Sequence, residues 1–403
     1  MENRMVRVVS HILDLDNPDQ DVQEGLFTVN NNAALKLDRN EVTVPPSPMV
    51  LKALKNSIND KPLNFYSDNQ SRKLRRKLSL YTGVNFDSIA CYYNQAAVME
   101  TIARTYLQPG LEALLALPSD SSFSHYASSV GAKVVNVTFS DLFEPKIEEI
   151  IADITHRTRL IYLANPNGIT GCSLTESELV FLLSYAENSL VVVDESYFEF
   201  SGITVADLIP KFSNLIIIRS FSKGFALAGF DTHYLMTDSR NFKFLNKIGF
   251  QKQPDTLAQA AAEAALEDFG YTAVIIRQIN ESKKMIFENL SGSGYEFRIT
   301  PANFFLLAAA DPRGLTAFLS KQNIFVHDLM GLQGFENYVR VTIGTPGQTI
   351  VLLNALAQCA AEQAISLKTT RMAEKPVTRV NSFHVPDNRA PIEGRVETQN
   401  VPY

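Results

Sequence analysis

An aspartate and a lysine, each placed after a short apolar run, are the residues of this chain best suited to chemistry. Asp194 follows the run at 189–193, and Lys223 follows the run at 214–218 after a few polar residues. Both runs are rich in Val and Ile and end abruptly, a pattern typical of strands that are buried on both faces. Ligands of open α/β sheets bind outside the carboxyl ends of the strands. We therefore expect the carboxylate and the amine to reach one site, although either residue alone is more often an ordinary turn residue.

This pair of groups points to one organic cofactor. A lysine that forms a Schiff base and an acid that faces a pyridinium nitrogen are the two protein groups that pyridoxal phosphate most needs. The acid keeps the ring nitrogen protonated, so that the ring can accept electrons from the α-carbon of an amino acid. We predict pyridoxal 5'-phosphate as the cofactor, with Lys223 as the catalytic residue and Asp194 at the ring nitrogen.

The elements that must position these residues alternate between strand and helix, which predicts an α/β fold with a mostly parallel sheet. Besides the two runs above, strands are predicted at 89–93, 111–117, 133–137 and 160–164, and a polar-aromatic loop at 119–126. Helices are predicted at 48–58, 72–81, 98–107, 175–186, 258–266 and 350–363, the fourth with a capping box formed by Thr175 and Glu178. A second, smaller layer of strands is predicted at 298–309, 324–326 and 339–344.

This pattern divides the chain into four parts. We expect an N-terminal arm at 1–36, a large cofactor-binding domain at 61–280, and a small C-terminal domain made of 37–60 and 281–366. Residues 367–403 are charged, contain proline and have few large apolar side chains, which predicts a flexible or wrapping tail.

Composition excludes several classes of function. The net charge is −6 and no basic block is present, which argues against a nucleic-acid partner. No apolar run approaches the ~20 residues that a membrane span needs, and the first residues lack the apolar core of a secretory signal. The three cysteines are scattered, with neither a metal spacing nor a disulfide framework. We predict a cytoplasmic protein with no metal site.

Several blocks of the chain resemble, in the same order, those of the fold-type-I pyridoxal-phosphate aminotransferases of class I/II. The blocks are residues 37–41 with 46–48, 66–68, 193–197, 220–223 with 227–229, and 340–346. The chain is most similar to the histidinol-phosphate aminotransferase group, over about residues 37–363. The resemblance implies a large domain with a mostly parallel central sheet, a smaller α+β domain, and a homodimer with shared active sites. It also implies an amino-acid substrate and a 2-oxo acid co-substrate.

The resemblance also assigns roles to residues. Tyr197 would bind the phenolic oxygen of the cofactor, and Arg340 would hold the α-carboxylate of the substrate, a bidentate task that lysine performs poorly. Phe123 or Tyr126 would stack on the cofactor ring, although packing within the loop is about as good an explanation of these aromatics. Contacts with the cofactor phosphate are implied for Ser220, for the helix start at Asn94 and Gln95, and for Tyr66 acting on the partner subunit.

Several positions depart from the pattern of the family, among them the phosphate loop, which is Asn94-Gln95-Ala96-Ala97 here and can still bind phosphate through its backbone N–H groups. The phosphate-binding arginine is replaced by Asp231, and two unit charges 4 Å apart repel by about 4 kcal/mol at an effective dielectric near 20. Three arrangements would avoid this repulsion: the side chain of Asp231 turns away, a cation such as protonated His233 lies between the charges, or the phosphate is no longer bound at this position. Asp231 could also bind a cationic group of the substrate. Gly168 replaces an asparagine that contacts the cofactor, a role that Asn167 could take over. His327 replaces the distal arginine that holds the substrate phosphate, so we do not expect histidinol phosphate as the substrate.

Three functions are consistent with these residues. The first is an aminotransferase acting on an L-amino acid in a specialised amino-acid or natural-product pathway. The second keeps the cofactor but performs decarboxylation, oxidation, elimination or cyclisation at the α-carbon. The third is a degenerate scaffold that has lost the cofactor, a reading opposed by the joint presence of Lys223, Asp194, Tyr197 and Arg340.

Overall fold

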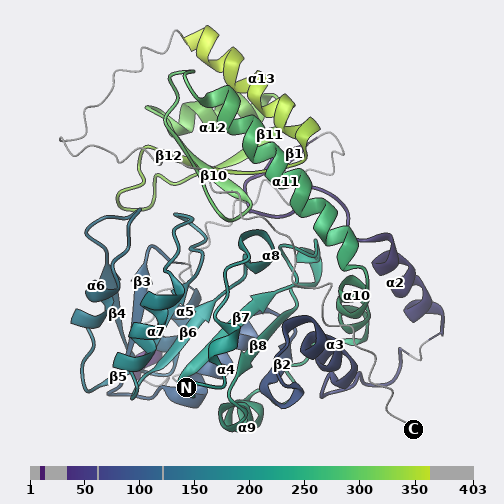
Figure 1. Cartoon of the computed structure of the whole chain (residues 1–403), viewed down its shortest axis with the longest axis vertical. Helices are drawn as coiled ribbons and strands as arrows, with labels where there is room; N and C mark the ends of the chain where they lie inside the picture. Colours follow the sequence, from purple (N-terminus) through teal and green to yellow (C-terminus); the bar gives the residue numbers. More distant parts are fainter. Residues whose placement is uncertain (1–9, 14–33, 61–62, 120–121, 364–403) are drawn as a thin grey trace, which may run out of the picture. The chain divides into compact units, whose positions relative to one another are not determined.

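The computed structural model describes residues 10–13, 34–60, 63–119 and 122–363, in which the strands form two sheets (Figure 1). The larger sheet has seven strands in the order β2-β8-β7-β6-β5-β3-β4. Its strands are β2 (Ile89–Tyr92), β3 (Glu112–Leu117), β4 (Lys133–Thr138), β5 (Thr158–Ala164), β6 (Leu190–Asp194), β7 (Leu215–Ser220) and β8 (His233–Thr237). Only β8 runs against its neighbours in this sheet; β3 to β7 pair in parallel wherever they meet. The prediction of a mostly parallel sheet is confirmed.

The apolar runs at 189–193 and 214–218 form most of β6 and β7. They pair in parallel with Asp194 opposite Ile218, and all residues of both strands are buried. Val and Ile are favoured in such strands because their branched side chains pack well on a pleated surface. The two strands are therefore neighbours that end at the same edge of the sheet, as predicted.

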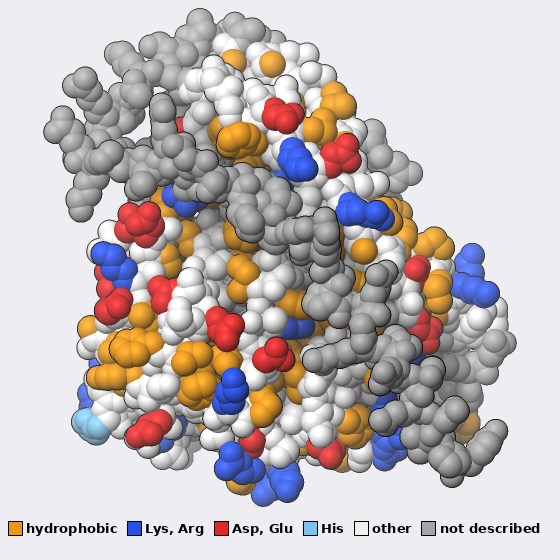
Figure 2. Space-filling view, in the orientation of Figure 1, with side chains coloured by type: hydrophobic (Ala, Val, Ile, Leu, Met, Phe, Trp, Pro, Cys, Tyr) orange, Lys and Arg blue, Asp and Glu red, His pale blue; other side chains and the backbone are white. Residues whose placement is uncertain are grey.

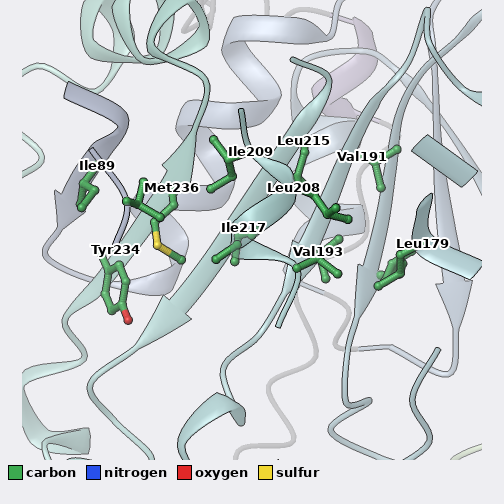
Figure 3. Close-up of a cluster of buried hydrophobic side chains, with 14 of the residues drawn as sticks. Ile89, Leu179, Val191, Val193, Leu208, Ile209, Leu215, Ile217, Tyr234 and Met236 are labelled. Atoms are coloured by element: carbon green, nitrogen blue, oxygen red, sulfur yellow. The ribbon is translucent and has the colours of Figure 1, made fainter. Parts of the chain in front are cut away.

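Helices cover both faces of the large sheet. Helices α4, α5 and α9 pack on one face and α3, α6, α7 and α10 on the other, as the two clusters of buried side chains show. Their bounds are α3 (Arg72–Thr82), α4 (Gln95–Tyr106), α5 (Ser122–Ser129), α6 (Ile147–Ala152), α7 (Glu176–Tyr185), α9 (Ser239–Ile248) and α10 (Thr256–Glu267). Figure 3 shows part of the second cluster, where Val193 of β6 lies near Leu179 of α7 and Ile217 of β7 lies between Val193 and Met236 of β8.

The smaller sheet has five strands in the order β1-β11-β12-β10-β9. Its strands are β1 (Leu35–Leu37), β9 (Phe297–Ile299), β10 (Phe304–Ala308), β11 (Ile324–Asp328) and β12 (Tyr338–Thr342). A third buried cluster joins this sheet to α11 (Phe269–Leu290), α12 (Pro312–Lys321) and α13 (Pro346–Gln363). The remaining helices are α1 (Ser10–Leu13), α2 (Pro48–Asp60), α8 (Phe198–Ser201), η2 (Phe86–Ser88), η3 (Ala206–Leu208) and η4 (Ala228–Phe230).

Two predicted elements were wrong, and one predicted capping box is present. Residues 122–129 form α5 although 119–126 were predicted as a loop, because Phe123 and Ala127 bury one side of an otherwise polar helix. The single strand predicted at 298–309 is a hairpin of β9 and β10, since Pro301 cannot continue a ladder and the chain turns there. The capping box of Thr175 and Glu178 is present at the start of α7.

The four-part division of the chain remains a prediction. The boundary at residue 280 falls inside α11, and α2, placed in the small domain, packs against α10. Most of the predicted arm (1–9 and 14–33) and the whole predicted tail (367–403) lie outside the described residues.

No helix in the described part of the chain has the length and apolar character to cross a membrane. On the face shown in Figure 2, positive and negative side chains are scattered among apolar ones.

Candidate active site

A cavity of about 390 Å³ lies at the carboxyl ends of the parallel strands, between the large sheet and residues of the small one. It includes both residues that the sequence analysis placed first, Asp194 and Lys223. The other predicted site residues that line it are Gln95, Asn167, Tyr197, Ser220, Asp231, His327 and Arg340. A volume of this size is within the usual range for small-molecule sites.

Asp194 ends β6 and is held by three donors. One carboxylate oxygen accepts hydrogen bonds from the backbone N–H of Ser196, at 2.9 Å, and from the Ser196 hydroxyl. The other accepts from the hydroxyl of Tyr162, at 2.9 Å. Asp194 is 5% exposed, and these bonds fix the direction of its carboxylate at the wall of the cavity.

Lys223 lies in the turn after β7, and its amine meets the segment that follows β1. Its Nζ donates to the backbone carbonyl of Arg39 at 3.0 Å. The next residue, Asn40, adopts a left-handed conformation with φ 54°, which asparagine tolerates. Its backbone N–H donates to the hydroxyl of Thr342, and its backbone carbonyl accepts from the side chain of Asn303. These bonds fix the Arg39 carbonyl against the amine.

Tyr197 follows β6, and its hydroxyl accepts a hydrogen bond from Asn40 Nδ2 at 2.9 Å. Gly168 lies beside the same ring, since a Cβ there would be 3.3 Å from the tyrosine oxygen. The side chain of Asn167 holds its own turn: Nδ2 donates to the carbonyl of Pro118 at 2.7 Å, and Oδ1 accepts from the backbone N–H of Ile169 and Thr170. Asn167 lines the cavity, but its oxygen is already used.

The start of α4, the end of β7 and the start of β8 form one end of the cavity. Asn94 does not line it; its side chain caps α4 by accepting from the backbone N–H of Ala97. The first backbone N–H groups of a helix have no partner within it, which suits them to an anion. Ser220, Ser222 and His233 line the cavity at this end.

Asp231 occupies the same end with a half-exposed side chain. Its backbone is left-handed, with φ 46° and ψ 28°, and its Oδ1 accepts from the Ser222 hydroxyl at 3.4 Å. The same oxygen is 3.6 Å from Nδ1 of His233. Burial lowers the pKa of His233, while the nearby carboxylate of Asp231 acts in the opposite direction. The aspartate and the histidine are therefore neighbours, as one of the three arrangements considered above requires.

Arg340 and His327 lie at the other end, side by side on β12 and β11. The guanidinium of Arg340 donates to the carbonyl of Gly168 at 3.0 Å and to that of Asp38 at 3.2 Å, which sets its orientation. Burial and then the charge of Arg340 lower the pKa of His327 to about 4. The imidazole is therefore neutral near pH 7.

The predicted aromatic residues lie elsewhere. Phe123 is completely buried and stacks on Tyr162, with ring centres 4.8 Å apart and planes at 4°. Tyr126 packs on the same buried cluster, and neither ring lines the cavity. Tyr162 does line it. Tyr66 is fully exposed and lies outside the cavity.

Among the lining residues to which sequence reasoning gave no role are Arg39, Asn40, Tyr162 and Ser222. Strand register would have found Tyr162, because it is on the same face of β5 as Ala164, the residue paired with Asp194. Diagonal neighbours of this kind are within reach of a long aromatic side chain. Asn40 lies in the block at 37–41 that resembles the family, but local pattern gave it no role, because its hydrogen bonds reach residues more than 100 positions away.

Comparison with known proteins decides the family. Residues 32–356 match the model of the family described as aminotransferase class I and II. The chain belongs to this family. It is 30% identical to a dihydroxyacetone phosphate transaminase of Campylobacter jejuni over 84% of this chain and 93% of that protein. It is 29% identical to histidinol-phosphate aminotransferase 2 of Carboxydothermus hydrogenoformans over 84% of this chain and 94% of that protein.

A solved structure supports the same fold. Histidinol-phosphate aminotransferase from Sinorhizobium meliloti, in complex with pyridoxal-5'-phosphate, is 22% identical with a TM-score of 0.77, and the match covers 90% of this chain and 99% of that one. Together with the class I and II family model, this similarity confirms the predicted fold class. The sequence similarity to histidinol-phosphate aminotransferase 2 confirms the resemblance to that group.

The chain is a transferase that depends on pyridoxal 5'-phosphate, as members of this aminotransferase family are. The donor set of the cavity fits this cofactor. It offers the amine of Lys223, the carboxylate of Asp194, the start of α4, and the hydroxyls of Ser220 and Ser222, with the second carboxylate, Asp231, beside His233. These are the group types needed for an aldehyde, a pyridinium nitrogen and a phosphate.

Proposed function

We propose that this protein is an aminotransferase that takes the amino group of an L-amino acid and transfers it to a 2-oxo acid or related carbonyl compound. The observation that carries the proposal is that the amine of Lys223, the carboxylate of Asp194 and the guanidinium of Arg340 line one cavity of about 390 Å³. An amine, an acid and an anion-binding group are what this transfer requires.

The residues of the cavity have separable tasks. When bound, pyridoxal phosphate supplies an aldehyde and a ring that withdraws electrons from the α-carbon. Asp194, held by Ser196 and Tyr162, would face the ring nitrogen and keep a proton there. Nζ of Lys223 would hold the aldehyde and then move the proton of the α-carbon. Tyr197, bonded to Asn40, would bind the phenolic oxygen.

Arg340 and His327 bear on the choice of substrate. The planar guanidinium of Arg340 suits the α-carboxylate of an amino acid. His327, with a pKa of about 4, offers no permanent positive charge where histidinol-phosphate enzymes have a second arginine. We propose on this basis that histidinol phosphate is not the substrate, and that the enzyme serves a specialised amino-acid or natural-product pathway.

We also propose a homodimer in which Tyr66 reaches the site of the partner. Exposed apolar side chains are grouped on α2 and directly after it: Met49, Leu51, Ile58, Leu63, Phe65 and Tyr66. Apolar side chains concentrated in this way are typical of an interface. Light scattering should report twice the chain mass of 44.8 kDa. A monomer at micromolar concentration would contradict this proposal.

The proposed reaction is tested with a panel of L-amino acids and carbonyl acceptors. The acceptors should include 2-oxo acids and dihydroxyacetone phosphate, which is named for one relative. Formation of a new amine from the acceptor supports transamination, and it should be abolished in Lys223→Ala. Release of carbon dioxide, peroxide or ammonia without a new amine would instead support another reaction at the α-carbon. Arg340→Ala should raise KM for the donor at least tenfold, whereas Arg313→Ala, on the exposed side of α12, should leave KM unchanged.

A further inference from the structure

His233 is the first residue of β8. The strand register places it at the same end of the cavity as the start of α4. It is opposite Ser220 of β7 and opposite Tyr92 of β2. Side chains of directly opposite residues in antiparallel strands point to the same face. This is the face that α4 covers, since Tyr92 and the next inward residue of β8, Leu235, both belong to the cluster that includes α4. The imidazole therefore lies on the same face of the sheet as Ser220, at the end of the cavity that Gln95 of α4 also lines.

The hydrogen bonds of the ring determine its tautomer. Nδ1 is 2.8 Å from the backbone carbonyl oxygen of Asp231. A carbonyl oxygen can only accept, so Nδ1 carries a hydrogen. The other nitrogen, Nε2, has no hydrogen-bond partner among the described residues, although the residue is 3% exposed and lines the cavity. The charged groups that face the ring are Asp231, Asp194 and Lys223.

We propose that Nε2 of His233 binds the phosphate of the cofactor as a hydrogen-bond donor, and that Asp231 positions the ring. This pair then replaces the phosphate-binding arginine of the aminotransferase family, and the inference rests on the cofactor of the proposed function. With Nδ1–H already bonded, a second proton on the ring must be at Nε2, the remaining nitrogen of a residue that lines the cavity.

The charges of the pair explain how an aspartate is tolerated in this position. The carboxylate of Asp231 is half exposed and 3.6 Å from Nδ1, so an imidazolium beside it cancels its charge. The attraction between the imidazolium of His233 and a phosphate then offsets the repulsion between Asp231 and that phosphate. Burial, and to a smaller extent the charge of Lys223, lowers the pKa of His233, whereas a bound phosphate dianion favours the charged form and raises it. Binding of the cofactor should therefore take up a proton at this residue.

The test compares pyridoxal 5'-phosphate with pyridoxal, which lacks the phosphate. His233→Gln should weaken the binding of the phosphorylated cofactor by about tenfold to a hundredfold, the range expected for a charge-assisted hydrogen bond. Its affinity for pyridoxal should not change. The matched control is His156→Gln, at an exposed position outside the cavity, which should bind both compounds as the wild type does. Binding is measured by fluorescence titration of the apoenzyme, independently of turnover.

A second measurement uses only the wild-type protein, so its result does not depend on whether a variant folds. Calorimetry of cofactor binding to the wild type at pH 8, in buffers of different ionisation enthalpy, counts the protons taken up. More protons should be taken up with pyridoxal phosphate than with pyridoxal. Equal proton uptake, equal weakening of both compounds in His233→Gln, or unchanged binding of the phosphorylated cofactor would each overturn the inference. A wild type that binds the cofactor in this way but transfers no amino group would refute the proposed function alone.

Discussion

Lys283 is a buried amine whose replacement should stabilise this protein. It lies on α11, where its Nζ donates a hydrogen bond to the carbonyl of Pro301 at 3.0 Å. No acidic side chain forms an ion pair with it in the part of the chain that the structure describes. The residue is 3% exposed, and burial lowers the pKa of the amine from 10.5 to about 7. Such a shift means that the folded state resists protonation of this group.

The size of the effect follows from this pKa. One pKa unit corresponds to about 1.4 kcal/mol, so a fall from 10.5 to about 7 costs about 5 kcal/mol of stability at neutral pH. Replacing Lys283 by Met removes this cost but leaves the Pro301 carbonyl without its donor, which costs about 1–3 kcal/mol. We expect a net gain of about 2–4 kcal/mol in the free energy of unfolding at pH 7.

The pH dependence gives the sign of the effect. Above pH 10.5 the amine is neutral in both states, and the cost is absent. As the pH falls towards 7 the unfolded state takes up a proton that the folded state does not, so stability is lost. The difference between Lys283→Met and the wild type should therefore grow by about 1.4 kcal/mol per pH unit from pH 9.5 to 7.5.

Urea unfolding at several pH values measures this difference. The control is Lys284→Met, at the exposed neighbouring position, which should change stability by less than about 0.5 kcal/mol at every pH. A difference for Lys283→Met that stays constant with pH would refute the reasoning, because it would mean that the buried amine is charged in the folded protein.

Three further predictions concern other parts of the fold. Arg219→Met should cost about 3–5 kcal/mol in urea unfolding, since it leaves Glu195 buried without its guanidinium at 2.8 Å, and adding Glu195→Gln should recover part of the loss. Arg340→Gln should raise the pKa of His327 from about 4 towards 6.5 in an NMR titration, and an unchanged value would mean that burial alone sets it. Gly171→Ala should lower the unfolding free energy by about 2 kcal/mol or more, since φ is +74° and the new methyl group would clash with a threonine between β9 and β10; no loss would mean that the turn is free to move.

Local pattern was enough to predict the large sheet and the position of its ligand edge. Unbroken Val and Ile runs identified β6 and β7, and the rule for the carboxyl ends of parallel strands led from them to Asp194 and Lys223. These inferences need only the period of the side chains and the direction of the strands. The same reasoning missed β8, a short strand that begins with a histidine and is antiparallel to both of its neighbours.

Contacts between distant segments could not be predicted in this way. Asn40 meets Tyr197 and Thr342 because the small sheet lies against the ends of the large one, and no spacing in the chain encodes that distance. The stacking of Phe123 on Tyr162 likewise depends on how α5 packs over β5. Propensity and periodicity describe neighbours in sequence, whereas these pairs are set by tertiary packing.

The two ends of the cavity depart from the family pattern in ways that are physically independent. Asp231 and His233 act where the start of α4 and Ser220 meet, on the large sheet. His327 and Arg340 act on the small sheet, where they are paired across β11 and β12. No hydrogen bond or ion pair joins the two groups among the described residues, so changes at one end should add to changes at the other. With the roles proposed above, cofactor-phosphate binding and the choice of substrate should be separately alterable, and a variant of His233 should leave the relative preference among amino-acid donors unchanged.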